Sequence, residues 1–199
     1  MCKSIEDSIF SGALSYLTGG LLLATGKPKY IWLGAFILIV GTMQWVDARL
    51  WYSIQHKIPT RPLALAVTAV LVGEILAAYG GYMYYTGKRM PLYEFVMILY
   101  VLVLVYNWFK YAGETVVTKN GYLMWGNYDF SSLEKIIFLF LITVPFLFYP
   151  DDFITYALFV TMIPIFIYTF KQKEFGSRWC QSFFAFDILV LGKLLVQGA

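Results

Sequence analysis

The chain has 199 residues, of which 60% are hydrophobic, 20% are aromatic and only 14% are charged, and its formal net charge is +3. Soluble domains have about a quarter of their residues charged, so this composition excludes a soluble enzyme. It also excludes intrinsic disorder, which requires low hydrophobicity and high net charge. Two cysteines and one histidine argue against a metal site or a disulfide framework. The scattered basic residues predict no nucleic-acid partner.

Seven apolar stretches are long enough to cross a bilayer as helices, because a hydrocarbon core of about 30 Å needs about 20 residues per helix. They cover residues 8–24, 30–52, 63–85, 92–111, 133–149, 153–170 and 179–197. Residues 31–40 and 97–105 are continuously apolar, which excludes the polar–apolar alternation of a β-barrel. The sequence therefore predicts an all-α integral membrane protein, with residues 1–199 forming a single domain of seven transmembrane helices.

The distribution of basic residues predicts the orientation of these helices. Residues 1–7 contain one lysine and two acids, without a basic start or a clear cleavage site, so the first helix is expected to remain as a membrane anchor. Of the 15 Lys and Arg residues, ten fall on the side that holds the N-terminus and five on the other side. Because basic loops stay in the cytoplasm, we predict a cytoplasmic N-terminus and an external C-terminus.

The longest connection, residues 112–132, contains the signal for a β-hairpin. Asn120-Gly121 lies between the short β-prone runs Val116-Val117-Thr118 and Tyr122-Leu123-Met124-Trp125. Asn-Gly between such runs favours a tight hairpin turn. We therefore expect a small β-hairpin between the fourth and fifth helices, on the N-terminal face. An irregular aromatic loop at the membrane interface is the alternative interpretation.

Polar and aromatic residues gather near the end of the 30–52 helix. Gln44, Asp47 and Trp51 are spaced by three and four residues, so they share one helix face, while Arg49 points elsewhere. An acid inside the bilayer costs roughly 2.5 to 3.5 kcal/mol, so Asp47 is expected to reach the interface or to find a partner. Either these residues form a site, or they are ordinary interfacial residues with tryptophan anchors.

Two further acids, Glu74 and Asp187, lie near the middle of predicted crossings. A carboxylate at that depth is hard to solvate, so both are expected to face the interior of the bundle. They are candidates to share a proton, to bind tyrosine hydroxyls or to bracket a watery cavity. The structural alternative is that each is protonated and serves only as a neutral hydrogen-bond donor.

Two cysteines are expected at the same membrane face. Cys2 opens the chain beside Ser4, and Cys180 follows Trp179 at the start of the last helix. If Met1 is removed, Cys2 presents an amine and a thiol together, which favours a nucleophile. Otherwise Cys2 is a candidate for binding a soft metal, for carrying an acyl chain or for simple packing.

Three short motifs resemble those of a family of seven-helix membrane proteins whose activity is not established. Those proteins open with Met-Cys-Phe-Ser, carry Gln-x-x-Glu-x-x-x-Trp in the second helix, and enter the seventh with Ser-x-Trp-Cys. The matching stretches are Met1-Cys2-Lys3-Ser4, residues 44–51 and Ser177-Arg178-Trp179-Cys180. Lys3 replaces an aromatic residue, and Asp47 replaces the glutamate. The resemblance implies the topology and the site residues but no activity.

Three functions stay open. The first is a bundle that binds or transports a small ligand or ion through a polar cavity, which opens between the second, third and seventh helices toward the N-terminal face. The second is a membrane-embedded enzyme using Cys2 or Cys180 with Asp47. The third is a structural membrane subunit. A retinal pigment is not favoured, because Lys193 and Asp187 diverge by about 120° around their helix. The expected partners are membrane lipid and a small-molecule ligand.

Overall fold

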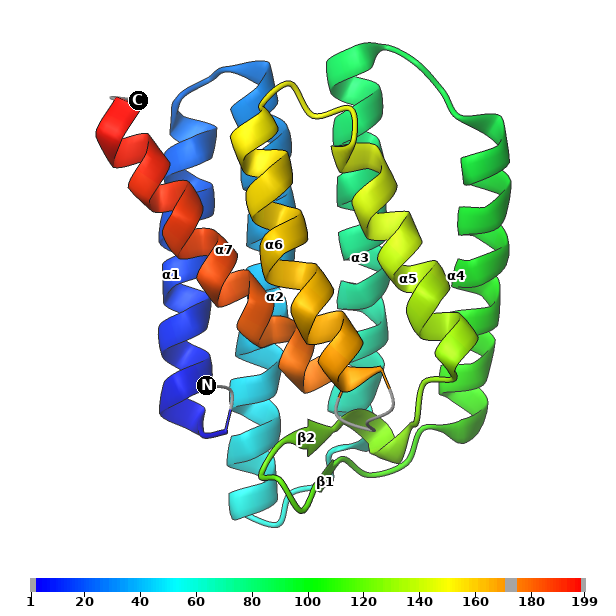
Figure 1. Ribbon diagram of the computed structural model, residues 1–199. Coiled ribbons are helices and arrows are strands. Elements are labelled where there is room, and N and C mark those ends of the chain that lie inside the picture. Colours follow the sequence, from blue (N-terminus) through cyan, green and yellow to red (C-terminus); the bar gives the residue numbers. More distant parts are fainter. Residues whose placement is uncertain (1–2, 171–174, 198–199) are drawn as a thin grey trace.

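The computed structural model describes residues 3–170 and 175–197, and the side chains in these ranges except those of residues 175–177, 179–181 and 197. Within them the chain forms seven α-helices, one two-stranded sheet and a short 3-10 helix (Figure 1). In chain order the elements are α1 (Ile5–Ala24), α2 (Pro28–Gln55), α3 (Arg61–Thr86), α4 (Pro91–Tyr111), β1 (Val116–Val117), β2 (Leu123–Met124), η1 (Trp125–Asn127), α5 (Ser132–Phe146), α6 (Asp152–Thr169) and α7 (Phe175–Gln197).

The helical fold expected from the sequence is confirmed, because each of the seven apolar stretches overlaps one of these helices over most of its length. Four of the described helices, α2, α3, α4 and α6, are long and apolar enough to cross a membrane. That number supports a membrane protein with several crossings. The first turns of α2, α3 and α4 each contain a proline, which fits there because the first helical N–H groups have no partner inside the helix.

The fifth helix is shorter than the sequence predicts, since α5 ends at Phe146 and not at residue 149. Pro145 lies in its last turn and has no N–H to donate to the carbonyl of Leu141. The Tyr93 hydroxyl of α4 donates a hydrogen bond to that carbonyl instead. The chain continues as turns to Tyr149.

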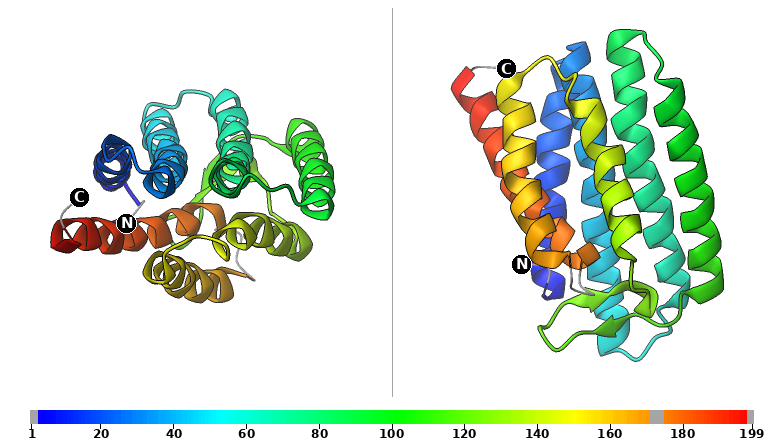
Figure 2. Two further views of the ribbon diagram at one scale, coloured as in Figure 1. Left: turned by 90° about the horizontal axis from the view of Figure 1, so that it is seen from above. Right: turned by 45° about the vertical axis from the view of Figure 1, so that its right-hand side comes forward.

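The helices form two layers (Figure 2). Seen from above, α1, α2, α3 and α4 lie in one row, and α7, α6 and α5 cover one face of that row. Large aromatic side chains fill the space between the layers: Trp32 stacks on Phe146 with ring centroids 5.2 Å apart, and Phe36 lies 5.6 Å from Phe183. These contacts join α2 to α5 and to α7.

The sheet between α4 and α5 is the predicted β-hairpin. Val116 pairs with Met124 and Val117 with Leu123 in antiparallel register. Gly121 has a φ of 76°, a left-handed conformation that glycine adopts without steric cost. The Asn-Gly interpretation is therefore confirmed, and the irregular loop is excluded.

The hairpin covers one end of the bundle, which we call the hairpin end. It is the end at which α1 and α7 begin and at which α2 and α6 finish, whereas the C-terminus of α7 lies at the opposite end (Figure 1). The aromatic ring of Tyr122 lies 4.6 Å from the Lys3 ammonium and 4.1 Å from the Arg178 guanidinium. The hairpin thus contacts both the start of α1 and the start of α7.

Candidate functional site

The most sharply defined part of the site is Asp47, near the hairpin end of α2. Its side chain has no exposed surface, and its Oδ1 accepts a hydrogen bond of 2.7 Å from the Trp125 indole N–H. Gln44 and Trp51 are also buried, with 1% and 8% of their surface exposed. The three residues therefore share one face of α2, as their spacing predicts, and that face is buried. Of the two outcomes expected for Asp47, the structure shows the one in which the carboxylate has a partner.

Two further residues lie close to Asp47, one in the sequence (Arg49) and one in space (Trp125). Arg49 is exposed and lies 4.9 Å from the ring centroid of Tyr52, on another side of α2. Trp125 was not a candidate, although it closes the β-prone run that predicts the hairpin. It is brought to Asp47 because η1 follows the hairpin directly and folds it onto the end of α2.

The residues at the start of the chain and of α7 are only partly described. Ser4 is the N-cap of α1, and its side chain accepts a hydrogen bond of 3.1 Å from the backbone N–H of Asp7. This contact gives Ser4 a structural role. Cys2, and the side chains of Trp179 and Cys180, lie outside the described residues, so the expected position of the two thiols at one membrane face stays a prediction.

The second part of the site is Asp187 in α7, which is 1% exposed. The Ser15 hydroxyl of α1 donates a hydrogen bond to its Oδ2. Its other oxygen, Oδ1, is buried and has no hydrogen-bond partner within the described part of the chain. The expectation that this acid faces the bundle interior is confirmed, but its contact is with α1, which the sequence interpretation did not include.

Ser15 belongs to a row of small polar residues on the buried face of α1. Ser8, Ser11 and Thr18 share this face at spacings of three or four residues. Among the described residues, the hydroxyls of Ser11 and Thr18 have no hydrogen-bond partner. The sequence contains this signal as a regular spacing of small polar residues in an apolar helix, although the spacing does not say which other helix this face contacts.

Glu74 is the third buried carboxylate, and no surface of its side chain is exposed. It lies on the buried face of α3, between Leu71 and Ile75. Its predicted inward orientation is confirmed. Asp47, Glu74 and Asp187 are thus three buried carboxylates, and each comes from a different helix: α2, α3 and α7.

The opposite end of the bundle carries a partly buried ion-pair cluster. The Lys193 ammonium donates a hydrogen bond to Asp151, and the Lys29 ammonium lies 3.7 Å from the other oxygen of the same carboxylate. Burial raises the pKa of Asp151, but the hydrogen bond from Lys193 and the charge of Lys29 outweigh burial, so the pKa lies below its ordinary value. Lys193 therefore pairs with Asp151 and not with Asp187.

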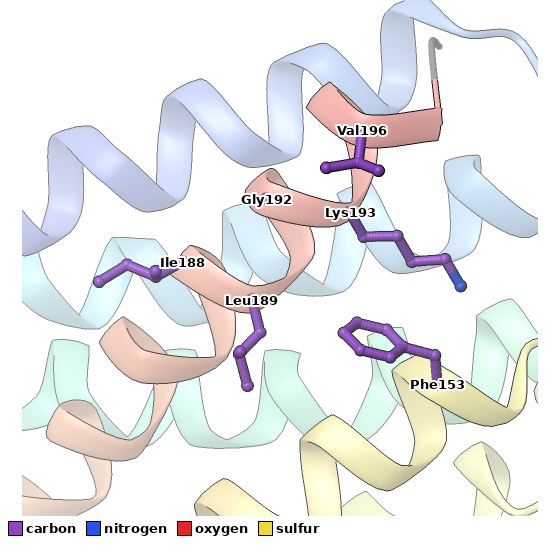
Figure 3. A pocket seen from close by; sticks show the side chains of 6 residues that line it. All are labelled: Phe153, Ile188, Leu189, Gly192, Lys193 and Val196. Carbon is purple, nitrogen blue, oxygen red and sulfur yellow. The ribbon is translucent and has the colours of Figure 1, made fainter.

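Apolar grooves among the described residues lie on the outer surface of the bundle. The groove between α6 and α7 has a volume of about 480 Å³ and is lined by Phe153, Ile188, Leu189, Gly192, Lys193 and Val196 (Figure 3). A second groove of about 390 Å³ runs between α4 and α5. Neither groove is lined by a residue that the sequence singled out as a candidate.

Comparison of the chain with family models, with curated proteins and with solved structures finds no match in any of the three. The resemblance drawn from the three short motifs therefore stays a prediction.

Proposed function

We propose that the protein is a seven-crossing membrane protein that binds or transports a small ion or ligand by means of its buried carboxylates, along a path that opens at the hairpin end. The observation that carries this proposal is Asp187, which is almost completely buried and has one oxygen without a hydrogen-bond partner among the described residues. A cation or a proton is the natural partner of such an oxygen.

The depth of the acids supports the proposal. Glu74 and Asp187 lie in the interior of α3 and α7, far from either helix end. Acids within membrane helices are rare, costly to insert and typical of ion or proton pathways. The hydroxyls of Ser11, Ser15 and Thr18 add hard oxygen ligands on the neighbouring α1.

The geometry of the bundle supports seven crossings. At 1.5 Å per residue, the 20 residues of α1 and the 23 residues of α7 reach about 30 Å or more, which is the thickness of the hydrocarbon core. α5 has 15 residues and is the shortest helix, but it runs beside α3 and α4 in the same layered bundle. The excess of basic residues at the hairpin end supports a cytoplasmic position for that end.

A flux measurement tests this function. The purified protein is reconstituted in liposomes that contain a pH-sensitive dye, and proton uptake is recorded with and without a sodium or potassium gradient. We expect uptake above that of empty liposomes, and a reduction of about tenfold or more in Glu74→Gln and Asp187→Asn. The exposed acid Asp152 supplies the matched control, since Asp152→Asn removes a carboxylate outside the bundle interior.

A measurement of thermal stability tests whether the protein binds the ion or ligand without transporting it. A ligand that binds only the folded state raises the unfolding temperature, by an amount that grows with the logarithm of the ratio of its concentration to its Kd. We expect protons, sodium or potassium to stabilise the wild type and not Asp187→Asn. If proton flux and ion-dependent stability are the same in the wild type, Glu74→Gln and Asp187→Asn, with all three eluting as folded protein, the proposal is wrong.

A further inference from the structure

The groove between α6 and α7 has the shape and lining of a site for a hydrocarbon chain. Figure 3 shows Phe153 of α6 facing Leu189 and Lys193 of α7 across it. Apart from the Lys193 ammonium, the lining side chains are apolar. Ile188 and Val196 are 49% and 87% exposed, so the groove is open to the surroundings of the bundle.

Charge is concentrated at the mouth of this groove. Lys193 lines the groove, and its ammonium lies 4.9 Å from the ring centroid of Phe153. Lys193 and Lys29 share the single carboxylate of Asp151, which leaves one positive charge on these three groups. The Lys29 side chain is 32% exposed, so its ammonium is accessible to a further anion.

Two more charged groups lie near the mouth. Lys27 lies close to the same tyrosine ring as Lys29, at 5.8 Å and 4.8 Å from the ring centroid of Tyr30. Asp152, in the first turn of α6, is exposed. The local balance is three lysines against two aspartates, so the mouth keeps a net positive charge.

An apolar groove below a positive mouth matches an amphipathic anion. We propose that this groove binds one acyl chain of an anionic phospholipid, whose phosphate is held by Lys29 together with Lys193. The polar part lies at the end of the bundle where α2 and α6 begin, and the chain follows α7 toward Ile188. Basic residues near a membrane surface attract anionic lipid electrostatically, and burial of methylene groups adds to that attraction.

Gly192 makes the groove testable without disturbing the helix packing. A Cβ added at Gly192 meets no atom within 4 Å, so the longer side chain of Gly192→Leu enters the groove without a clash in its first atom. Gly20 in α1 is the matched control, because a Cβ there also meets nothing within 4 Å and the residue is exposed outside the groove.

The experiment measures retained lipid by native mass spectrometry of the full-length protein. Delipidated protein is mixed in detergent with either phosphatidylglycerol or phosphatidylcholine of identical acyl chains. We expect the wild type to keep one phosphatidylglycerol molecule about tenfold more often than phosphatidylcholine. Gly192→Leu is expected to lose this bound lipid, whereas Gly20→Leu keeps it.

A second pair of variants tests the charge at the mouth. Lys29→Ala should lower the preference for phosphatidylglycerol by about fivefold, the size of effect of one basic residue at an anionic surface. Lys88→Ala, an exposed lysine in another connection at the same end, should leave it unchanged. Equal retention of the two lipids by the wild type, or equal retention by Gly192→Leu and Gly20→Leu, would overturn the proposal.

Discussion

Asp47 shows how a single buried carboxylate ties two distant segments together. It lies on α2, and its partner Trp125 follows the hairpin 78 positions later in the chain. Water does not reach this acid, so the indole N–H replaces part of its solvation. Removing one partner of a buried hydrogen bond costs about 1 to 3 kcal/mol of stability.

We therefore predict that Trp125→Phe destabilises the protein by about 2 kcal/mol, because it removes the indole N–H that donates to the buried Oδ1 of Asp47. The unfolding temperature in detergent measures the effect. Trp45→Phe is the control, since Trp45 lies on the same helix and is 38% exposed. Equal unfolding temperatures for the two variants would show that the contact with Asp47 contributes nothing.

Glu114 shows a different use of a carboxylate, at the hairpin end and outside the helices. Its Oε2 accepts hydrogen bonds from the Thr60 hydroxyl at 2.6 Å, and from the backbone N–H groups of Thr60 at 2.5 Å and Arg61 at 3.2 Å. It therefore caps the start of α3 from a distant loop, where the N–H groups have no helical partner. The hydrogen bond from the Thr60 side chain contributes most to holding the pKa of Glu114 below its ordinary value of 4.5.

This lowered pKa predicts a pH dependence of stability. The ionised carboxylate stabilises the folded state above the ordinary pKa of 4.5, and this contribution is lost as the pH falls through the lower pKa of the folded state. We expect the wild type to unfold at a higher temperature than Glu114→Gln above pH 4.5. The difference should shrink as the pH is lowered further below 4.5. A difference that stays constant over that range would exclude an electrostatic role for Glu114.

At the scale of the elements, glycines decide how closely neighbouring helices approach. A Cβ added at Gly34 of α2 would lie 2.8 Å from the carbonyl oxygen of Gly19 in α1, closer than real Cβ contacts. A Cβ added at Gly81 of α3 would lie 1.7 Å from the Trp32 ring of α2. Trp32 is 1% exposed and stacks on Phe146, so it has no room to move away.

Adjacent glycines in α3 give a controlled test of this packing. Gly81→Ala is predicted to destabilise the protein by about 1 to 3 kcal/mol or more, because the methyl group collides with Trp32. Gly80→Ala places the methyl group where no atom lies within 4 Å, so it should be neutral or stabilising by up to about 1 kcal/mol. Thermal unfolding of the two variants in detergent measures the difference. Similar unfolding temperatures would contradict the close contact between α2 and α3.

At the scale of the whole molecule, the two ends of the bundle differ in their charged residues. The hairpin end carries the excess of Lys and Arg residues, and the opposite end carries Asp151 and Asp152 with their neighbouring lysines. Because basic residues resist transfer across the membrane, this asymmetry supports the proposed orientation with the hairpin end in the cytoplasm.

Cysteine labelling in intact cells tests the orientation. In a variant with Cys2 and Cys180 replaced by alanine, Lys119→Cys places a thiol in the hairpin and Lys88→Cys places one at the opposite end. We expect a membrane-impermeant maleimide to label Lys88→Cys in intact cells, and Lys119→Cys only after permeabilisation. Labelling of both thiols from outside would contradict an orientation with the hairpin in the cytoplasm.

The sequence by itself determined the class of the protein, the places of the seven helices and the hairpin. Those features depend on local composition, because apolar length and an Asn-Gly turn act over neighbouring residues. The burial of Glu74 and Asp187 was predictable for the same reason, since an acid in an apolar helix must face away from lipid. For Asp47, close to a helix end, the sequence left an interfacial position open.

Only the tertiary structure decided which groups these acids meet. Trp125 reaches Asp47, Ser15 reaches Asp187, and Lys193 pairs with Asp151, each across more than 40 positions of the chain. Helix periodicity states which face a residue occupies but not which other helix covers that face. The partner depends on how tilted helices pack in two layers, and that arrangement follows from side-chain shape over the whole bundle.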